Sequence, residues 1–158
     1  GEPLTGRGGY AGEFGQNRPG AGDRLSDRGT LEDEVSRARV VALLGLHDAD
    51  EPTLAAAIAA SDDPRVAAEL RRQQGILAVA LGNAINVFNP ELAVLGGYLA
   101  TLLAWRPGAL VEAVAAATIP AAMEGVSIVP AGLGEDRLLI GAAELGFRAL
   151  LRDPAGVR

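Results

Sequence analysis

Apolar residues recur along much of this chain with the period of an amphipathic helix. Between residues 31 and 46 this period predicts one helix, with Arg37 and Arg39 on its polar side. The residues predicted for its apolar face are Leu31, Val35, Ala38, Ala42 and Gly45. A short Ala-rich helix is predicted over residues 53–60.

A long helix is predicted to begin at Asp63-Pro64 and to run to about Val87. Asp is a favourable N-cap, and Pro suits the first position of a helix. From Gly75 onward almost every residue is apolar or small, so this half should be buried on most sides. The charged residues of the first half, which are Arg65, Glu69, Arg71 and Arg72, are expected to form a solvated face.

The remaining pattern alternates short strands with helices. Strands are predicted at residues 92–95 and 126–129. Helices are predicted over residues 98–104, 107–118 and 138–151, with a break at Trp105-Arg106-Pro107-Gly108 and close packing at Gly141-Ala142-Ala143. Residues 1–29 are rich in Gly and Arg, which predicts a loop with a short strand near residues 8–11. The alternation indicates an α/β fold.

Composition narrows the class of protein. With 158 residues, of which 49% are hydrophobic, the chain can form one domain or a large part of one. It contains no Cys, which excludes a disulfide framework, and its formal charge of −6 argues against a broad nucleic-acid-binding face. No run of about eighteen uncharged apolar residues and no signal-peptide pattern occurs, so we expect a soluble, cytoplasmic domain.

Two polar groups have competing interpretations. His47 lies beside Asp48, Asp50 and Glu51, and a solvated turn is favoured over a metal site there. Asn83 and Asn86 interrupt the apolar half of the long helix and must find hydrogen-bond partners if they are buried. They are expected to tie that helix to the following strand, with a place near a ligand as the alternative.

Three glycine-containing segments stand out. The first runs from Gly8 to Gln16, the second from Asp23 to Glu32, and the third from Asn83 through Asn89-Pro90 and a short strand to Gly96-Gly97. The end of the third has the form of a phosphate- or nucleotide-binding edge, although by itself a Gly-Gly pair after a buried strand is usually only a tight turn. The first two resemble motifs of the ROK family (repressors, open reading frames and sugar kinases), Gly-Glu-x-Gly-His and Cys-x-Cys-Gly-x-x-Gly-Cys-x-Glu. The third and the run from Ile140 to Gly146 also resemble that family. The resemblance covers nearly the whole chain and implies a partial actin-like, ribonuclease-H-like fold. It matches roughly the second half of a ROK protein, so a fragment is expected.

The resemblance places four zinc positions in residues 1–30, and all four have changed. The family's His falls on Gln16, and its three Cys fall on Asp23, Leu25 and Thr30. Zinc prefers thiolate sulfur and imidazole nitrogen, so we predict that no metal is bound. Asp27 and Glu32 are interpreted as surface and helix-start acids rather than as substitute ligands.

Three residues remain candidates for sugar binding by this resemblance: Glu13, Gln16 and Glu32. A carboxylate can accept two hydroxyl hydrogen bonds, and Gln16 can replace one hydrogen bond of an imidazole. Glu32 also has a structural interpretation, since Thr30 is a candidate N-cap and acids suit a helix start. Glu13 is simply a solvated acid if the loop has changed its role.

On the nucleotide side, the resemblance points to Gly96, Gly97 and Tyr98. The family's kinases keep a third small residue where Tyr98 stands. The phenol would fill or block an adenine pocket, stack on a base, or belong to the core. We read it, together with the lost zinc ligands, as evidence against ATP use.

Two functions follow from the resemblance. The first is a sugar-sensing, dimerising domain of a ROK transcriptional regulator, which binds a sugar or sugar phosphate without catalysis and reaches operator DNA through a domain outside this chain. The alternative is an ATP-dependent ROK sugar kinase whose catalytic Asp would also lie outside these residues. A module that serves only for dimerisation is the third interpretation.

Overall fold

The long helix predicted after Asp63-Pro64 forms the axis of the molecule. The computed structural model describes residues 4–20 and 24–154. Helix α4, Pro64–Phe88, starts where the Asp63 carboxylate accepts a hydrogen bond from the Arg65 amide at 2.8 Å. It ends at Asn89, which adopts a left-handed conformation with φ 44° and ψ 56°. Both boundaries agree with the sequence prediction.

Two short strands lie along one side of α4. Strand β1, Leu92–Leu95, pairs in parallel with β2, Ser127–Pro130, so that Leu92 lies opposite Ser127 and Leu95 opposite Pro130. Parallel strands require a crossover connection. Here it consists of α5 (Tyr98–Trp105), α6 (Pro107–Ala116) and α7 (Pro120–Met123). The predicted strands, the two longer helices and the break between them are confirmed, whereas the one-turn helix α7 was not predicted.

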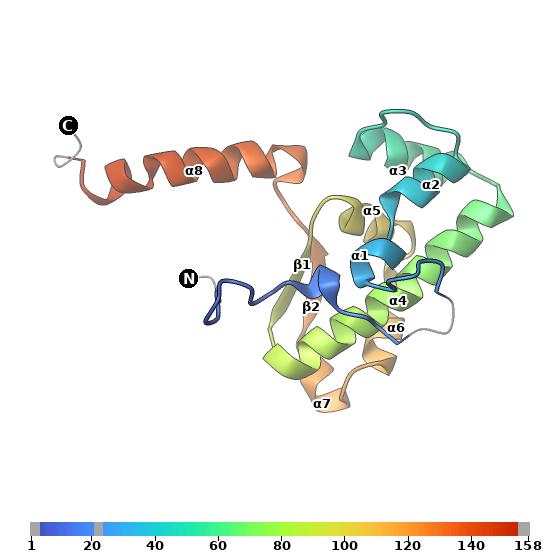
Figure 1. Ribbon diagram of the computed structural model, residues 1–158, viewed down its shortest axis with the longest axis horizontal. Helices are drawn as coiled ribbons and strands as arrows, with labels where there is room; N and C mark the ends of the chain where they lie inside the picture. The colour runs from blue at the N-terminus through green and yellow to red at the C-terminus, as the bar shows by residue number, and fades with distance from the viewer. Residues whose placement is uncertain (1–3, 21–23, 155–158) are drawn as a thin grey trace.

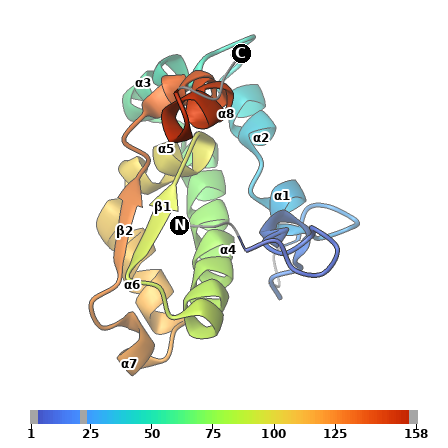
Figure 2. The ribbon, with the colours of Figure 1, turned by 90° about the vertical axis from the view of Figure 1, so that its left-hand side faces the viewer.

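Among the described residues before α4, four short helical segments occur. They are η1 (Phe14–Gln16), α1 (Leu31–Glu34), α2 (Arg37–Leu43) and α3 (Glu51–Ala60). In Figure 2 the strands lie on one side of α4, and α1 lies with the N-terminal loop on the other side. Helix α4 therefore separates the sheet from the Gly-rich segment.

The core forms where α3, α5 and α6 meet α4. Its fully buried side chains include Leu54, Leu70, Ile85, Leu102, Leu110 and Val114. The end of α6 comes so close to α4 that a Cβ on Gly82 would lie 2.8 Å from the carbonyl oxygen of Ala117. Only glycine fits at this crossing without displacing backbone.

The helix predicted over residues 31–46 is interrupted after α1. Val35 (φ −91°, ψ 76°) and Ser36 (φ −108°, ψ 113°) leave the helical conformation. The carbonyl oxygens of Glu34 and Ser36 accept hydrogen bonds from Arg72 at 2.8 Å and from Gln73 at 3.0 Å. Because two side chains of α4 donate hydrogen bonds to these carbonyl groups, the helix does not have to continue past Glu34 to satisfy them.

The interruption also changes the buried face. Val40 is fully buried, whereas Ala38, Ala42 and Gly45 are exposed. The face predicted from one uninterrupted period was therefore wrong beyond Val35. The direction of α2 depends on tertiary hydrogen bonds, and these leave no periodic pattern in the sequence.

The N-terminal segment is a loop, as predicted, but it contains no strand in residues 4–20. Gly6, Gly9 and Gly12 have φ angles of 65°, 80° and 94°. Repeated positive φ angles fold the segment into turns and prevent an extended strand. The strand predicted near residues 8–11 was therefore wrong.

Helix α8, Arg137–Arg152, follows η2, Gly134–Asp136, and extends away from the body of the molecule (Figure 1). It confirms the closing helix predicted over residues 138–151 and extends it by one residue at each end. The predicted close packing at Gly141-Ala142-Ala143 was wrong, because no atom of another described element lies within 4 Å of a Cβ placed on Gly141. Several of its large apolar side chains are exposed, including Leu138, Leu139, Leu145, Phe147 and Leu151.

No single helix among the described residues is long and apolar enough to cross a membrane. Helices α5 and α6 reach the length and apolar character of a membrane span only when they are taken together, and they are bent by 97° relative to each other. Both contribute fully buried residues to the core.

Candidate functional site

The Gly-rich segment is fixed against both α1 and α4. The carbonyl oxygen of Asn17 accepts a hydrogen bond from the Leu31 amide at 2.8 Å. The ring of Phe14 packs edge-on against Phe88 at the end of α4, with 5.7 Å between ring centroids. These contacts place the short helix η1 beside the start of α1.

The structure brings together two of the three residues predicted to bind sugar. Gln16 Nε2 donates a hydrogen bond to Glu32 Oε1 at 2.7 Å. The Glu32 side chain is 48% exposed, and Arg28 Nη2 lies 3.6 Å from its Oε1. A Cβ on Gly15 would lie 3.1 Å from Glu32 Oε2, so glycine leaves room for the carboxylate. An amide and a carboxylate are thus presented to solvent in a fixed relation.

Glu13, the third predicted residue, lies on the same segment, three positions before Gln16. It is exposed, and it stands at the N-cap of η1 without a side-chain capping hydrogen bond. Its carboxylate therefore has no role in starting that helix. The Gln16 amide donates a hydrogen bond to the Glu13 carbonyl oxygen at 3.2 Å, so the backbone of η1 joins Glu13 to the Gln16–Glu32 pair.

The structural interpretation of Glu32 is only partly correct. Thr30 is the N-cap of α1, but its hydroxyl donates a hydrogen bond to Asp33 Oδ2 at 2.8 Å and caps no amide. Asp33 also accepts two hydrogen bonds from Arg28, both at 2.9 Å. Asp33 rather than Glu32 is therefore the acid used at the helix start.

The residues at the predicted zinc positions do not fit zinc. Gln16 bonds to Glu32, Thr30 bonds to Asp33, and Leu25 offers only an aliphatic side chain. Asp23 lies outside the described residues. An amide, a hydroxyl and a leucine do not supply the sulfur and imidazole ligands that zinc requires.

A buried carboxylate instead lies beneath the loop of residues 24–29. Glu34 Oε1 accepts hydrogen bonds from the Ser26 amide at 2.8 Å and the Ser26 hydroxyl at 2.7 Å. The Leu25 amide lies 3.1 Å from both carboxylate oxygens. Arg72 Nη1 donates to Oε2 at 2.7 Å, and the Glu34 side chain is only 2% exposed. Glu34 thus joins the loop to α4.

The network continues along α4 to the end of the sheet. Arg72 also bonds to both carboxylate oxygens of Glu69, at 2.9 and 2.8 Å. Gln73 donates to Glu69 at 2.7 Å and accepts a hydrogen bond from the Tyr98 hydroxyl at 2.8 Å. The network therefore connects α1 with the first residue of α5.

These contacts shift the acidity of the buried groups. Burial alone would raise the pKa of Glu34, but the hydrogen bonds from Ser26, Leu25 and Arg72 outweigh burial and lower the pKa to about 2. Burial likewise opposes the effect of Arg72 and Gln73 on Glu69, whose pKa is nevertheless lowered. Burial raises the pKa of Tyr98 above its usual value. Both carboxyl groups are therefore ionised near neutral pH.

The sequence prediction of a solvated face on the first half of α4 was wrong for two residues. Glu69 is 9% exposed and Arg72 is 12% exposed, whereas Arg65 and Arg71 are exposed. Their spacing of three residues was visible in the sequence. Their partner Glu34 lies 38 positions before Arg72, and nothing in the sequence pattern connected the two.

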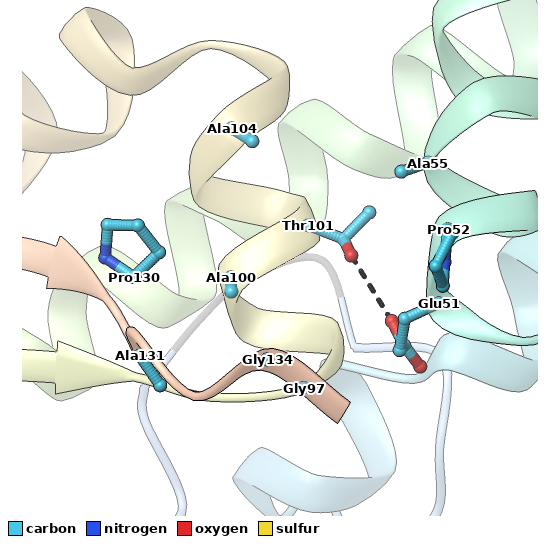
Figure 3. Close-up of a pocket in the computed structure, with 10 residues that line it drawn as sticks. All are labelled: Glu51, Pro52, Ala55, Gly97, Ala100, Thr101, Ala104, Pro130, Ala131 and Gly134. Atoms are coloured by element: carbon cyan, nitrogen blue, oxygen red, sulfur yellow. Dashed lines mark hydrogen bonds between the residues drawn. The ribbon is translucent and has the colours of Figure 1, made fainter. Parts of the chain in front are cut away.

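The predicted nucleotide side contains a cavity of about 310 Å³ (Figure 3). It lies beside Gly97, where β1 meets α5, and also contacts the segment after β2. Glu51 and Thr101 give it a polar wall, in which the Thr101 hydroxyl donates to Glu51 Oε2 at 3.1 Å. Most of the other lining residues are small or apolar.

Tyr98 does not line this cavity. Its side chain packs against the core, and its hydroxyl reaches Gln73 on α4. This geometry agrees with the interpretation of Tyr98 as a core residue. Gly97 adopts a positive φ of 56°, which suits glycine at the end of β1. The assignment of Gly96, Gly97 and Tyr98 to a nucleotide remains a prediction.

The two asparagines of α4 lie elsewhere than expected. Both are exposed, so the prediction that this half is buried on most sides was too broad. Asn86 accepts a hydrogen bond from the Ile119 amide at 2.9 Å and bonds to the Ala117 carbonyl at 3.5 Å. It therefore ties α4 to the connection between α6 and α7, not to the following strand. Asn83 lines a cavity of about 340 Å³ with Asn17, Arg18 and Pro19.

The acidic connection before α3 is a turn with exposed His47 and Asp48. Asp50 caps α3 by accepting a hydrogen bond from the Thr53 amide at 2.8 Å. Glu51 belongs to α3 and pairs with Arg37 at 2.8 Å. Within residues 4–20 and 24–154, no group of His, Asp and Glu is arranged to hold a metal ion.

Comparisons with known proteins identify the family and the fold of the chain. A sequence profile described as the ROK family matches residues 1–148. Among solved structures, one described as a ROK family transcriptional regulator, homolog of the E. coli MLC protein, superposes with a TM-score of 0.62 at 21% identity. The match covers 80% of this chain and 36% of that chain, so it supports the fold alone. No curated protein sequence matches the chain.

The profile and the solved structure confirm the resemblance carried by the glycine-containing segments. They also confirm the partial actin-like α/β fold expected from it. The family profile matches residues 1–148, and the fold is that of a solved ROK-family structure. The chain therefore belongs to the ROK family.

Proposed function

We propose that this chain is the sugar-sensing domain of a ROK-family transcriptional regulator, and that Glu13, Gln16 and Glu32 bind hydroxyl groups of a sugar or sugar phosphate. The hydrogen bond between Gln16 and Glu32 carries this proposal. It holds an amide and a half-exposed carboxylate together at the surface. The carboxylate oxygens can accept hydroxyl donors, while the amide oxygen of Gln16 can accept a further one.

Three observations support binding without catalysis. The residues at the zinc positions do not offer zinc ligands. Tyr98 is directed toward Gln73 and away from the cavity beside Gly97. The solved relative is described as a transcriptional regulator. A protein that only senses a sugar does not need the nucleotide-binding parts that phosphoryl transfer requires.

We further propose that the parent protein is a homodimer and that it binds operator DNA through residues outside this chain. The chain spans 36% of the matched regulator structure, which leaves room for such a domain. The formal charge of −6 disfavours DNA contact by this segment. We place the protein in the cytoplasm, where transcriptional regulators act.

A thermal-shift screen of the full-length protein tests this function. Hexoses, hexose phosphates and amino sugars are added one at a time, and the unfolding temperature is recorded for wild type, Glu32→Gln and Glu112→Gln. A ligand at about 100 times its Kd stabilises a folded protein by about 2.7 kcal/mol, which raises the unfolding temperature by several degrees.

Glu112 is the matched control because it is an exposed acid on α6, on another part of the domain. We expect one class of sugar to stabilise wild type and Glu112→Gln, and to have a much smaller effect on Glu32→Gln. Equal stabilisation of all three proteins would place the sugar site elsewhere.

A further inference from the structure

We propose that Glu34 is the positioning residue of the sugar-binding pair, holding the loop of residues 24–29 and helix α1 in place through a buried carboxylate. The inference rests on the proposed sugar-binding function of Gln16 and Glu32.

The contacts of the 24–29 loop converge on Glu34. Its carboxylate accepts the Leu25 amide, the Ser26 amide and the Ser26 hydroxyl at 2.7–3.1 Å. The Ser26 hydroxyl oxygen in turn accepts the Gly29 amide at 3.0 Å. Both ends of the loop are therefore connected, directly or through Ser26, to a single buried acid.

The same carboxylate is held from the interior side. Arg72 donates to Glu34 Oε2 at 2.7 Å and to the Glu34 carbonyl oxygen at 2.8 Å. Arg72 is oriented by its two hydrogen bonds to Glu69. A charged group with several well-placed donors keeps one orientation, since turning it would break several hydrogen bonds at once.

The position of Glu34 determines the position of the proposed site. Glu32 and Glu34 belong to the same four-residue helix, so fixing Glu34 fixes the backbone that carries Glu32. The 24–29 loop also carries Arg28, which bonds to Asp33 at 2.9 Å and lies 3.6 Å from Glu32. If the loop moves, Glu32 loses a neighbouring cation and α1 loses its outer support.

The carboxylate cannot be replaced by an amide of the same shape. In Glu34→Gln one acceptor oxygen becomes an NH₂ donor, which must face Arg72 or the amides of Leu25 and Ser26, all of which are donors. We expect the volume to remain filled while the loop is released. Glu69→Gln is the matched control, because it neutralises another buried carboxylate but keeps one acceptor oxygen for Arg72 and leaves the direct contacts between Glu34 and the loop in place.

The test uses hydrogen–deuterium exchange of the full-length wild type, Glu34→Gln, Glu69→Gln and Ser26→Ala, followed by calorimetric titration with the sugar that stabilises wild type. Ser26→Ala leaves the buried ion pairs intact, so it tests the loop contact even if Glu34→Gln does not fold. In Glu34→Gln we expect protection of residues 24–29 to fall about 10-fold or more while α4 stays protected. Sugar affinity should fall by about 10-fold, the effect of losing roughly 1.4 kcal/mol of binding free energy.

In Ser26→Ala we expect a smaller change confined to the same loop, and in Glu69→Gln we expect the loop to keep its protection. Unchanged loop protection in both Glu34→Gln and Ser26→Ala would overturn the proposal. Equal loss of loop protection in Glu69→Gln would also overturn it, since the effect would then be one of general stability. The exchange measurement tests the role of Glu34 independently of sugar binding. Absence of sugar binding to wild type would instead contradict the proposed function.

Discussion

Glu32 and Glu34 lie two residues apart on helix α1, yet the Glu32 side chain is 48% exposed and the Glu34 side chain is 2% exposed. Glu32 faces solvent and bonds to Gln16, whereas Glu34 faces α4 and is surrounded by donors. The outer acid keeps capacity for a ligand, while the inner acid has its partners within the protein. The comparison teaches that neighbouring acids on one short helix can differ in role, one anchoring a loop and the other, by our proposal, binding a ligand.

Loss of the cation in the inner network should have the largest effect. Arg72→Ala leaves the buried carboxylates of Glu34 and Glu69 without the cation that they share, so we expect a loss of about 3–5 kcal/mol in the free energy of unfolding. Urea unfolding measures the loss. Arg71→Ala is the control, since Arg71 is the exposed neighbour on the same helix and should have little effect. Similar midpoints for the two variants would contradict the inner network.

Acid should weaken the inner region next. The pKa values of Glu34 and Glu69 are lower in the folded protein than in the unfolded chain, and that of Glu34 is about 2. Their contribution to stability is therefore present above the unfolded value of about 4.5 and is lost as the pH falls toward 2. Urea unfolding between pH 7 and pH 3 should show a smaller loss for Glu34→Gln than for wild type. Parallel curves would show that Glu34 does not contribute.

The far end of the network is tested by Tyr98→Phe. This change removes the donor to Gln73, whose side chain is fully buried, and should cost about 1–2 kcal/mol. Tyr10→Phe is the matched control, because Tyr10 is 80% exposed. The two variants are compared by urea unfolding. If Tyr98→Phe is as stable as Tyr10→Phe, the hydroxyl is not held in the core and the nucleotide-side interpretation gains support.

The outer region should show the smallest effect on stability. Gln16→Ala removes an exposed hydrogen bond, so the free energy of unfolding should change by no more than about 0.5 kcal/mol. The same variant should bind sugar more weakly than wild type, as measured by calorimetry. A large loss of stability would make the Gln16–Glu32 pair a structural contact and remove the contrast with Glu34.

Much of the fold was predictable because its signals are local. The Asp63-Pro64 start of α4, the break before Pro107 and the two strands follow from capping, proline geometry and short apolar runs. The break after Glu34 was not predictable in this way. It depends on Arg72 and Gln73, which lie more than 35 positions away and compete for carbonyl groups of α1 and its neighbour Ser36.

The sequence named two residues of the candidate site but not the network beneath them. The resemblance to the ROK motifs pointed to Gln16 and Glu32 as candidates, and the fold places these two side chains 2.7 Å apart. The role of Glu34 depends on burial and on main-chain donors from Leu25 and Ser26, neither of which leaves a pattern in the sequence. From the sequence alone, an acid and a cation on separate helices are both predicted to be exposed to solvent, because the packing of those helices is not known.

The central claim is that the full-length protein senses a sugar without using a nucleotide, and calorimetric titration tests it most directly. Wild type and Glu13→Ala are titrated with hexoses, hexose phosphates and amino sugars, and separately with ATP and Mg²⁺. We predict that wild type binds one class of sugar, that Glu13→Ala loses this binding, and that neither protein binds ATP. Binding of both a sugar and ATP to wild type would contradict the regulator account and identify a sugar kinase.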